Sequence, residues 1–285
     1  MRSRFNPTGA LAAVVAAGGL VAAACGGSPT VTPPPVTNTP PVIEALSIGP
    51  RAEADHPIQI TATVKDLETP LSQLTYTWSA SPQTGIFSGN SIVGSQVQIM
   101  WRPPKGQKTP DLYTVTLSVN EAYTSAGQTK QNSVSSSTTV HYNDSLAEMQ
   151  ALGYDFLVYK FGNFTVSPAQ AVSNFSDSCR GKSAEFDDIQ ANRDNFHILS
   201  ASFIQTMISV DSSLTTGTVD GRCQFEDIPN SGPNAGRREF VSGTCHLTTV
   251  YETFRWFLCD STFAGDGDPV LASLRGRVPG RIMLR

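Results

Sequence analysis

Four of the five cysteines lie in the last part of the chain, where their thiols could form disulfides or bind a metal. They are Cys179, Cys223, Cys245 and Cys259. No two of them have the Cys-x-x-Cys spacing that is typical of zinc sites, so two disulfides explain this even set better. Disulfides persist in exported proteins, and the pattern therefore predicts an oxidising compartment.

Histidines and carboxylates could supply acid–base catalysis, but no catalytic motif contains them. The chain has four histidines and lacks His-Glu-x-x-His, Gly-x-Ser-x-Gly and glycine-rich phosphate-loop sequences. A carboxylate near His246 could act as a general base if a pocket enclosed both groups. The acidic residues Glu185, Asp187 and Asp188 are better explained as stabilising the start of a helix through its dipole. We therefore predict no catalytic residue and no cofactor.

Acidic residues in loops raise the question of a calcium site. Asp66, Glu68 and Asp111 lie in one candidate region, and Asp266 and Asp268 form a second. Calcium takes about six to eight oxygen ligands, which is more than either group offers. Turn capping and solvation explain these side chains better, and we predict no metal site.

The N-terminal residues 1–24 have the features of a secretory signal peptide. Two arginines precede a small apolar run, residues 9–24, that is too short to cross a bilayer comfortably. The run ends in three alanines that are followed directly by Cys25. This order predicts export and removal of residues 1–24.

The Ala-Ala-Ala-Cys-Gly sequence that ends at Gly26 resembles the lipobox of bacterial lipoproteins. The resemblance implies cleavage before Cys25, lipid on its thiol, and an anchored protein in the cell envelope. Glycine rather than aspartate at position 26 implies delivery to the outer membrane. An ordinary signal peptide with an incidental cysteine is the alternative.

Charge argues against two classes of partner. The formal net charge is −4, and removal of residues 1–24 would take away two arginines and no acid, which leaves −6. Such mild acidity does not favour nucleic acid or anionic lipid headgroups. We therefore expect the membrane to be contacted through the N-terminal lipid, and an envelope protein or a small ligand to be the remaining partner.

Residues 25–41 predict a linker. After Cys25 the segment consists mainly of Gly, Ser, Thr, Val, Asn and Pro, including three consecutive prolines at 33–35. Proline restricts its own φ and extends the preceding residue, so such a tether spans roughly 3 Å per residue. Because nothing here can build a core, we predict a spacer.

Residues 42–142 predict an all-β unit, because short segments of alternating polar and apolar residues recur between turns rich in glycine and proline. The Tyr-x-Trp sequence at 76–78 and the Tyr-x-Val-x-Leu sequence at 113–117 resemble those of immunoglobulin-like and PKD-like domains of bacterial surface proteins. The resemblance implies an immunoglobulin-like sandwich. We expect Trp78 to be its large core residue and Trp101 to pack at a turn.

Residues 143–263 have a different period and predict an α+β domain. Their spacing of apolar residues predicts helices over about 145–160, 167–175 and 181–196, and strands from about 198 onward. Helices followed by a meander of strands indicate helices packed on one face of a curved antiparallel sheet.

The strand pattern also orders the cysteines. If the evident Pro- and Gly-rich loop joins two strands, Cys223 and Cys245 lie opposite each other, and the period of two turns both inward. This favours pairing Cys223 with Cys245 and Cys179 with Cys259, among the three pairings that four cysteines allow. The same period places Phe257 and Cys259 on the inner face.

The last strands, with Val-Tyr-Glu-Thr-Phe-Arg-Trp at 250–256, are similar to those of the NTF2-like fold. Relatives with that fold divide between enzymes with an acid–base residue in the cone and non-catalytic binding domains. A plain α+β domain of another family is the alternative. The tail, residues 264–285, carries four arginines among apolar residues, and its sequence is compatible with a final strand, a docking arm or an unstructured end.

Together these observations predict a lipid-anchored, non-catalytic envelope protein that presents a binding domain on an immunoglobulin-like stalk. The first alternative is an enzyme with an acid–base site in an NTF2-like cone pocket, and the second is a purely structural envelope component. An open apolar cavity containing a carboxylate or histidine would favour the enzyme, whereas a filled core would favour a non-catalytic protein.

Overall fold

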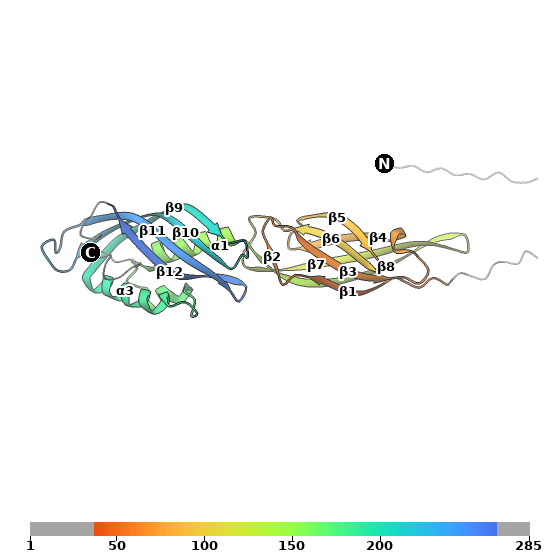
Figure 1. Ribbon diagram of the computed structural model, residues 1–285, viewed down its shortest axis with the longest axis horizontal. Helices are drawn as coiled ribbons and strands as arrows, with labels where there is room; N and C mark the ends of the chain where they lie inside the picture. Colours follow the sequence, from red (N-terminus) through yellow and green to blue (C-terminus); the bar gives the residue numbers. More distant parts are fainter. Residues whose placement is uncertain (1–36, 267–285) are drawn as a thin grey trace, which may run out of the picture. The chain divides into compact units, whose positions relative to one another are not determined.

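The computed structural model describes residues 37–266, which from Asn38 onward form one compact unit (Figure 1). The predicted signal peptide, Cys25, most of the linker and nearly all of the tail lie outside the described residues. Strands dominate the described chain in three four-stranded sheets, as the sequence predicted. No helix within residues 37–266 is long and apolar enough to cross a membrane.

The first part of this unit is built from two sheets, and we call it the two-sheet part. Its elements are β1 (Val42–Ile48), β2 (Arg51–Glu53), β3 (Ile58–Lys65), η1 (Leu71–Gln73), β4 (Thr75–Ser81), β5 (Ile86–Val93), β6 (Gln96–Arg102), β7 (Asp111–Ser125) and β8 (Gln128–Asn143). One sheet has the order β1-β3-β6-β5 and the other the order β2-β8-β7-β4. The pairing is antiparallel except that the short β2 runs parallel to β8.

The two sheets pack face to face, because alternate residues of each strand point into a shared apolar core. Trp101 is the largest side chain that is fully buried, and its Nε1–H donates to the carbonyl oxygen of Thr84 at 2.8 Å. Trp78 is only partly buried, so the expected roles of the two tryptophans were wrong. The reason is position in the sheet: Trp101 lies on the interior strand β6, whereas Trp78 lies on the edge strand β4.

The second part combines helices with one sheet, and we call it the helix-and-sheet part. Its elements are α1 (Ser145–Tyr154), the π-helical turn η2 (Asp155–Lys160), α2 (Pro168–Ala171), η3 (Val172–Asn174), α3 (Gly181–Asn195), β9 (Phe196–Val210), β10 (Thr216–Pro229), β11 (Glu239–Glu252) and β12 (Arg255–Gly265). The sheet has the order β12-β11-β10-β9 and is antiparallel throughout. The three helical segments and the strands after them lie where the sequence predicted.

Local sequence explains where the helices begin. The side chain of Asp144 accepts from the backbone N–H of Ala147 at 3.2 Å and caps α1. Ser167 and Gln170 form a capping box at the start of α2, whose first turn contains Pro168. The helices cover one face of the sheet, and α3 packs along β12 (Figure 1).

The cysteines lie in two pairs, Cys179 with Cys259 and Cys223 with Cys245, at S–S distances of 2.00 and 2.10 Å. This is the pairing that the strand period favoured. Cys223 and Cys245 face each other between β10 and β11 and are fully buried. The other pair joins the segment before α3 to β12.

One face assignment in β12 was wrong. Phe257 and Cys259 were expected to point inward, but the structure buries their neighbours Trp256 and Leu258 instead. The register between β11 and β12 shifts at this point, so that Cys259 is the extra residue of a β-bulge. An extra residue moves every side chain on one side of it to the opposite face.

Candidate functional site

A buried polar cluster joins the two parts of the unit where β8 passes into α1. We call it the junction site, and its members are Arg51 and Glu53 from β2, Asn143 from β8, Ser145 and Glu148 from α1, Tyr251 from β11 and Trp256 from β12. All of these side chains are buried or half-buried. Polar groups at this depth are stable only when they are hydrogen-bonded, so their pairing decides what the site can do.

Ser145 is the central residue of the junction site. Its backbone N–H donates to Glu53 Oε1 at 2.7 Å, and its hydroxyl donates to Glu53 Oε2 at 2.8 Å. The same hydroxyl oxygen accepts from Arg51 Nη2 at 2.7 Å and from Trp256 Nε1 at 2.8 Å. One hydroxyl therefore connects β2 of the two-sheet part with α1 and β12 of the helix-and-sheet part.

Arg51 extends this connection. Its guanidinium forms an ion pair with Glu53 at 2.7 Å and lies 3.6 Å from the centre of the Tyr251 ring. Its Nη1 also donates to the backbone carbonyl of Leu214 at 2.6 Å. A planar cation that is stacked and hydrogen-bonded at once is held in one orientation, as arginine favours at interfaces.

Glu148 occupies the other half of the site. Its carboxylate accepts from Asn143 Nδ2 at 2.8 Å, from the hydroxyl of Thr109 and from the backbone N–H of Trp256 at 3.3 Å. Burial raises the pKa of Glu148, although these hydrogen bonds oppose the shift. Burial likewise raises the pKa of Tyr251 to about 12, and its hydroxyl donates to Asn143 Oδ1 at 2.6 Å.

A cavity of about 270 Å³ lies beside the junction site. Its lining residues are Thr109, Pro110, Ala147, Glu148, Ala151, Leu152, Asp155, Asn174, Arg255, Trp256 and Phe257. The apolar walls could hold the body of a small ligand, and Glu148, Asp155 and Arg255 offer charged groups to orient it. Since the carboxylate of Glu148 is already hydrogen-bonded by the protein, it has the features of a structural group more than those of a free general base.

The acid–base pair that the sequence suggested lies elsewhere. His246 Nδ1 is 2.6 Å from Asp220 Oδ1, but both residues belong to the face of the sheet opposite Cys223 and Leu247. The inner face, where a cone pocket was considered, carries a packed cluster. Its fully or nearly fully buried members include Phe156, Phe161, Phe175, Phe225, Leu247 and the Cys223–Cys245 pair.

The acidic residues of α3 are not the simple helix-start charges that we expected. Glu185 and Asp188 are buried, and the hydroxyl of Ser261 on β12 donates to Glu185. Asp187 is exposed. The period of the helix places residues three apart on one face, and the burial of that face became evident only when β12 packed against it.

The loop carboxylates behave as turn caps. Asp66 Oδ1 accepts from the backbone N–H groups of Glu68 and Thr69 at 2.9 and 2.6 Å, and Asp111 accepts from that of Leu112 at 2.8 Å. Within residues 37–266 no group of three or more His, Cys, Asp and Glu has the arrangement of a metal site.

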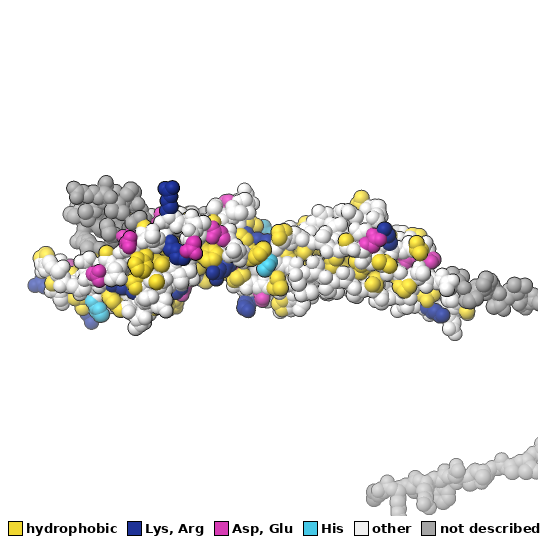
Figure 2. All heavy atoms as spheres, turned by 90° about the horizontal axis from the view of Figure 1, so that it is seen from below, with side chains coloured by type: hydrophobic (Ala, Val, Ile, Leu, Met, Phe, Trp, Pro, Cys, Tyr) yellow, Lys and Arg dark blue, Asp and Glu magenta, His cyan; other side chains and the backbone are white. Residues whose placement is uncertain are grey.

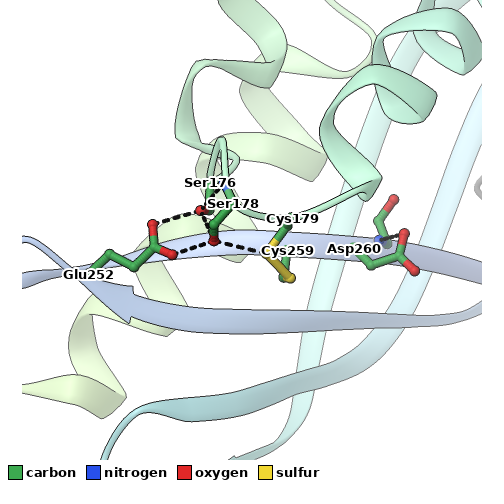
Figure 3. Close-up of a disulfide and its surroundings, with 7 residues drawn as sticks. Ser176, Ser178, Cys179, Glu252, Cys259 and Asp260 are labelled. Carbon is green, nitrogen blue, oxygen red and sulfur yellow. Dashed lines mark hydrogen bonds between the residues drawn. A yellow bond between two sulfur atoms is a disulfide. The ribbon is translucent and has the colours of Figure 1, made fainter.

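A second carboxylate ties the Cys179–Cys259 pair to its surroundings (Figure 3). Ser176 and Ser178 both point toward Glu252 at the end of β11, and Ser176 Oγ donates to Glu252 at 2.6 Å. These hydrogen bonds lower the pKa of Glu252. The loop before α3 is therefore held by a covalent link and by hydrogen bonds, a polar contact that the sequence analysis did not identify.

Charged side chains are scattered over the face of the molecule shown in Figure 2, and they do not gather into one patch there. The junction site escaped the sequence analysis because its residues lie far apart in the chain and belong to no motif. The hydrogen-bonding side chains next to the predicted N-cap were the available signal. No protein-family model matches the chain, and a search of the curated proteins finds no significant match.

Proposed function

We propose that the protein is a lipid-anchored component of the cell envelope in which the two-sheet part supports the helix-and-sheet part for binding. The junction site carries this proposal. A stalk must transmit position to the domain that it presents, and hydrogen bonds among Glu53, Ser145 and Trp256 hold both parts in one arrangement. A loose linker at this place would have the opposite character.

The architecture supports a more specific version of the proposal. Two packed sheets with a buried tryptophan are compatible with an immunoglobulin-like domain, and helices followed by four antiparallel strands are compatible with an NTF2-like domain. The lipid would attach at Cys25, followed by a proline-rich spacer. One acyl chain binds a membrane only marginally and two or more hold durably, so a diacylated Cys25 would suffice as an anchor.

The packing of the inner sheet face supports binding over catalysis. Aromatic side chains and the Cys223–Cys245 pair fill the region where an enzyme of the cone type would need its pocket. The cavity of about 270 Å³ beside Trp256 is the place where this proposal locates a small ligand. An envelope protein that contacts the exposed faces of the sheets is the corresponding macromolecular partner.

Mass spectrometry of the mature protein, extracted from membranes, tests the anchor. We expect an N-terminal Cys25 with the mass of its attached acyl chains, and a Cys25→Ser variant that leaves the membrane fraction. Ser28→Ala, a change of similar size three residues further along, is the control and should fractionate like the natural protein. Retention of residues 1–24, or membrane association of Cys25→Ser, would refute the anchored form of the proposal.

A further inference from the structure

The two edges of the sheet in the helix-and-sheet part are treated differently by the fold. On the β12 side, Phe175 forms a backbone bridge with Leu258, the N–H of Ser176 donates to the Leu258 carbonyl, and the Cys179–Cys259 pair closes the same edge. On the β9 side, the sheet order ends, and no strand among residues 37–266 pairs with the outer edge of β9. Backbone N–H and C=O groups along that edge are therefore available to another strand.

The sequence of β9 does nothing to protect this edge. Natural edge strands are commonly blunted by charged residues or proline. The 15 residues of β9 contain no Asp, Glu, Lys, Arg or Pro, whereas β10, β11 and β12 each contain charged residues. Three apolar side chains of β9 are exposed instead: Leu199, Ile204 and Met207, of which Ile204 is 64% exposed.

The free part of β9 is regular over a useful length. Its register with β10 shifts beside Leu199 and again beside Thr206, but it is continuous from Ser200 to Gln205. At one end of this stretch, residues 198–201 line a groove of about 460 Å³ together with residues 158–159 and 162–165. Tyr159 and Phe164 contribute exposed rings to this groove, so apolar surface continues from the strand edge onto the neighbouring segment.

The best match to this edge is β9 itself. A strand with charged side chains would bring them unpaired against an uncharged apolar edge, whereas a second β9 brings none. Antiparallel pairing about a two-fold axis makes a self-complementary contact. With the axis at Phe203, the middle residue of β9, residues 198–201 of one copy lie opposite residues 205–208 of the other, and Met207 of the second copy reaches the groove.

We propose that two copies of the protein associate through antiparallel pairing of their β9 edges, which joins two four-stranded sheets into one. The backbone hydrogen bonds of residues 200–205 give the contact its affinity. The exposed side chains Leu199, Ile204 and Met207, together with the groove lined by Tyr159 and Phe164, give it specificity. The contact does not involve the junction site and does not depend on the lipid.

Analytical ultracentrifugation of the mature chain carrying Cys25→Ser, with both cysteine pairs oxidised, tests the proposal. We expect a monomer–dimer equilibrium in which Ile204→Lys raises the dissociation constant by at least about tenfold, since each 1.4 kcal/mol changes it tenfold. Phe240→Lys is the matched control, because Phe240 is 79% exposed on the interior strand β11 and lies away from the edge. Melting curves of both variants establish that they fold.

Hydrogen exchange gives an independent readout of where the contact lies. The amides of residues 200–205 should become more protected as the concentration of the natural chain rises, and this gain should disappear in Ile204→Lys. A chain that stays monomeric up to its solubility limit would overturn the proposal. So would a dimer that Ile204→Lys leaves intact, or one that Phe240→Lys weakens more than Ile204→Lys does.

Discussion

The two parts of this protein are both rich in strands, yet they are held together by different means. The two-sheet part contains no cysteine and relies on a buried series of rings in which Phe87, Trp101, Tyr113 and Tyr142 follow one another at centroid distances of 6.1, 5.7 and 4.8 Å. The helix-and-sheet part has short and irregular helical segments, such as the four-residue α2, and is joined by two cysteine pairs. Regular pairing of long strands stabilises a part without cross-links, whereas short segments around one sheet benefit from covalent ties.

Removing the cross-links should therefore affect only one side of this comparison, and it should have the largest effect. Loop-closure entropy assigns about 4–5 kcal/mol of unfolding free energy to the Cys179–Cys259 link, which spans 80 residues, and about 3 kcal/mol to the Cys223–Cys245 link, which spans 22. Denaturant titration of the double variants Cys179→Ser/Cys259→Ser and Cys223→Ser/Cys245→Ser measures both losses. A larger loss for the shorter loop would contradict the entropic explanation.

The corresponding change in the two-sheet part is Trp101→Ala. Removing this fully buried ring leaves a cavity and an unpaired Thr84 carbonyl, so we expect a loss of about 3–5 kcal/mol in unfolding free energy. Trp78→Ala is the control, because the same chemical change at a partly buried edge position should cost clearly less. Equal losses at the two positions would mean that strand position does not determine which tryptophan supports the core.

Changing the junction site tests whether the two parts unfold together. Ser145→Ala removes a hydroxyl that pairs with Glu53, Arg51 and Trp256, and it should lower the unfolding free energy by about 1–3 kcal/mol. Differential scanning calorimetry should then show two separated transitions where the natural chain shows one. Ser133→Ala, at an exposed position of β8, is the control and should leave the transition unchanged.

The smallest expected effect concerns pH and only the helix-and-sheet part. Asp227 on β10 is fully buried, and neither carboxylate oxygen has a hydrogen-bond partner among the described residues. Burial, together with the charge of Glu239, raises the pKa of Asp227 to about 6. Because the folded state favours the protonated acid, this stabilisation is complete below about pH 4 and is lost as the pH rises through about 6.

Urea titrations between pH 4 and 7 measure this loss, which we expect to be about 1–2 kcal/mol once partial screening by water is allowed for. Asp227→Asn carries no ionisable group at this position and should flatten the profile. The same substitution at the exposed Asp187 is the control and should leave the profile as it is. A natural profile that is already flat would show that water or a rearrangement satisfies the Asp227 carboxylate.

Patterns of local origin were predicted well from the sequence. The helix starts follow from Asp144 and Ser167, which offer side-chain oxygens to free backbone N–H groups wherever the rest of the chain lies. The facing of Cys223 and Cys245 follows from strand period and one loop. Features that depend on a neighbour across space were not predicted: the bulge at Cys259, the burial of Glu185 and the whole junction site.

By itself, the sequence determined which segments are strands and helices and which cysteines face each other, because side-chain period and capping act between residues close in the chain. Tertiary structure alone decided that Trp101 lies at the core centre, that Ser145 joins the two parts and that β9 ends its sheet without a partner among the described strands. Those outcomes depend on the order of strands in each sheet and on which polar groups meet when water is excluded. No local pattern of residues carries that information, since it arises only when distant segments compete for the same neighbours.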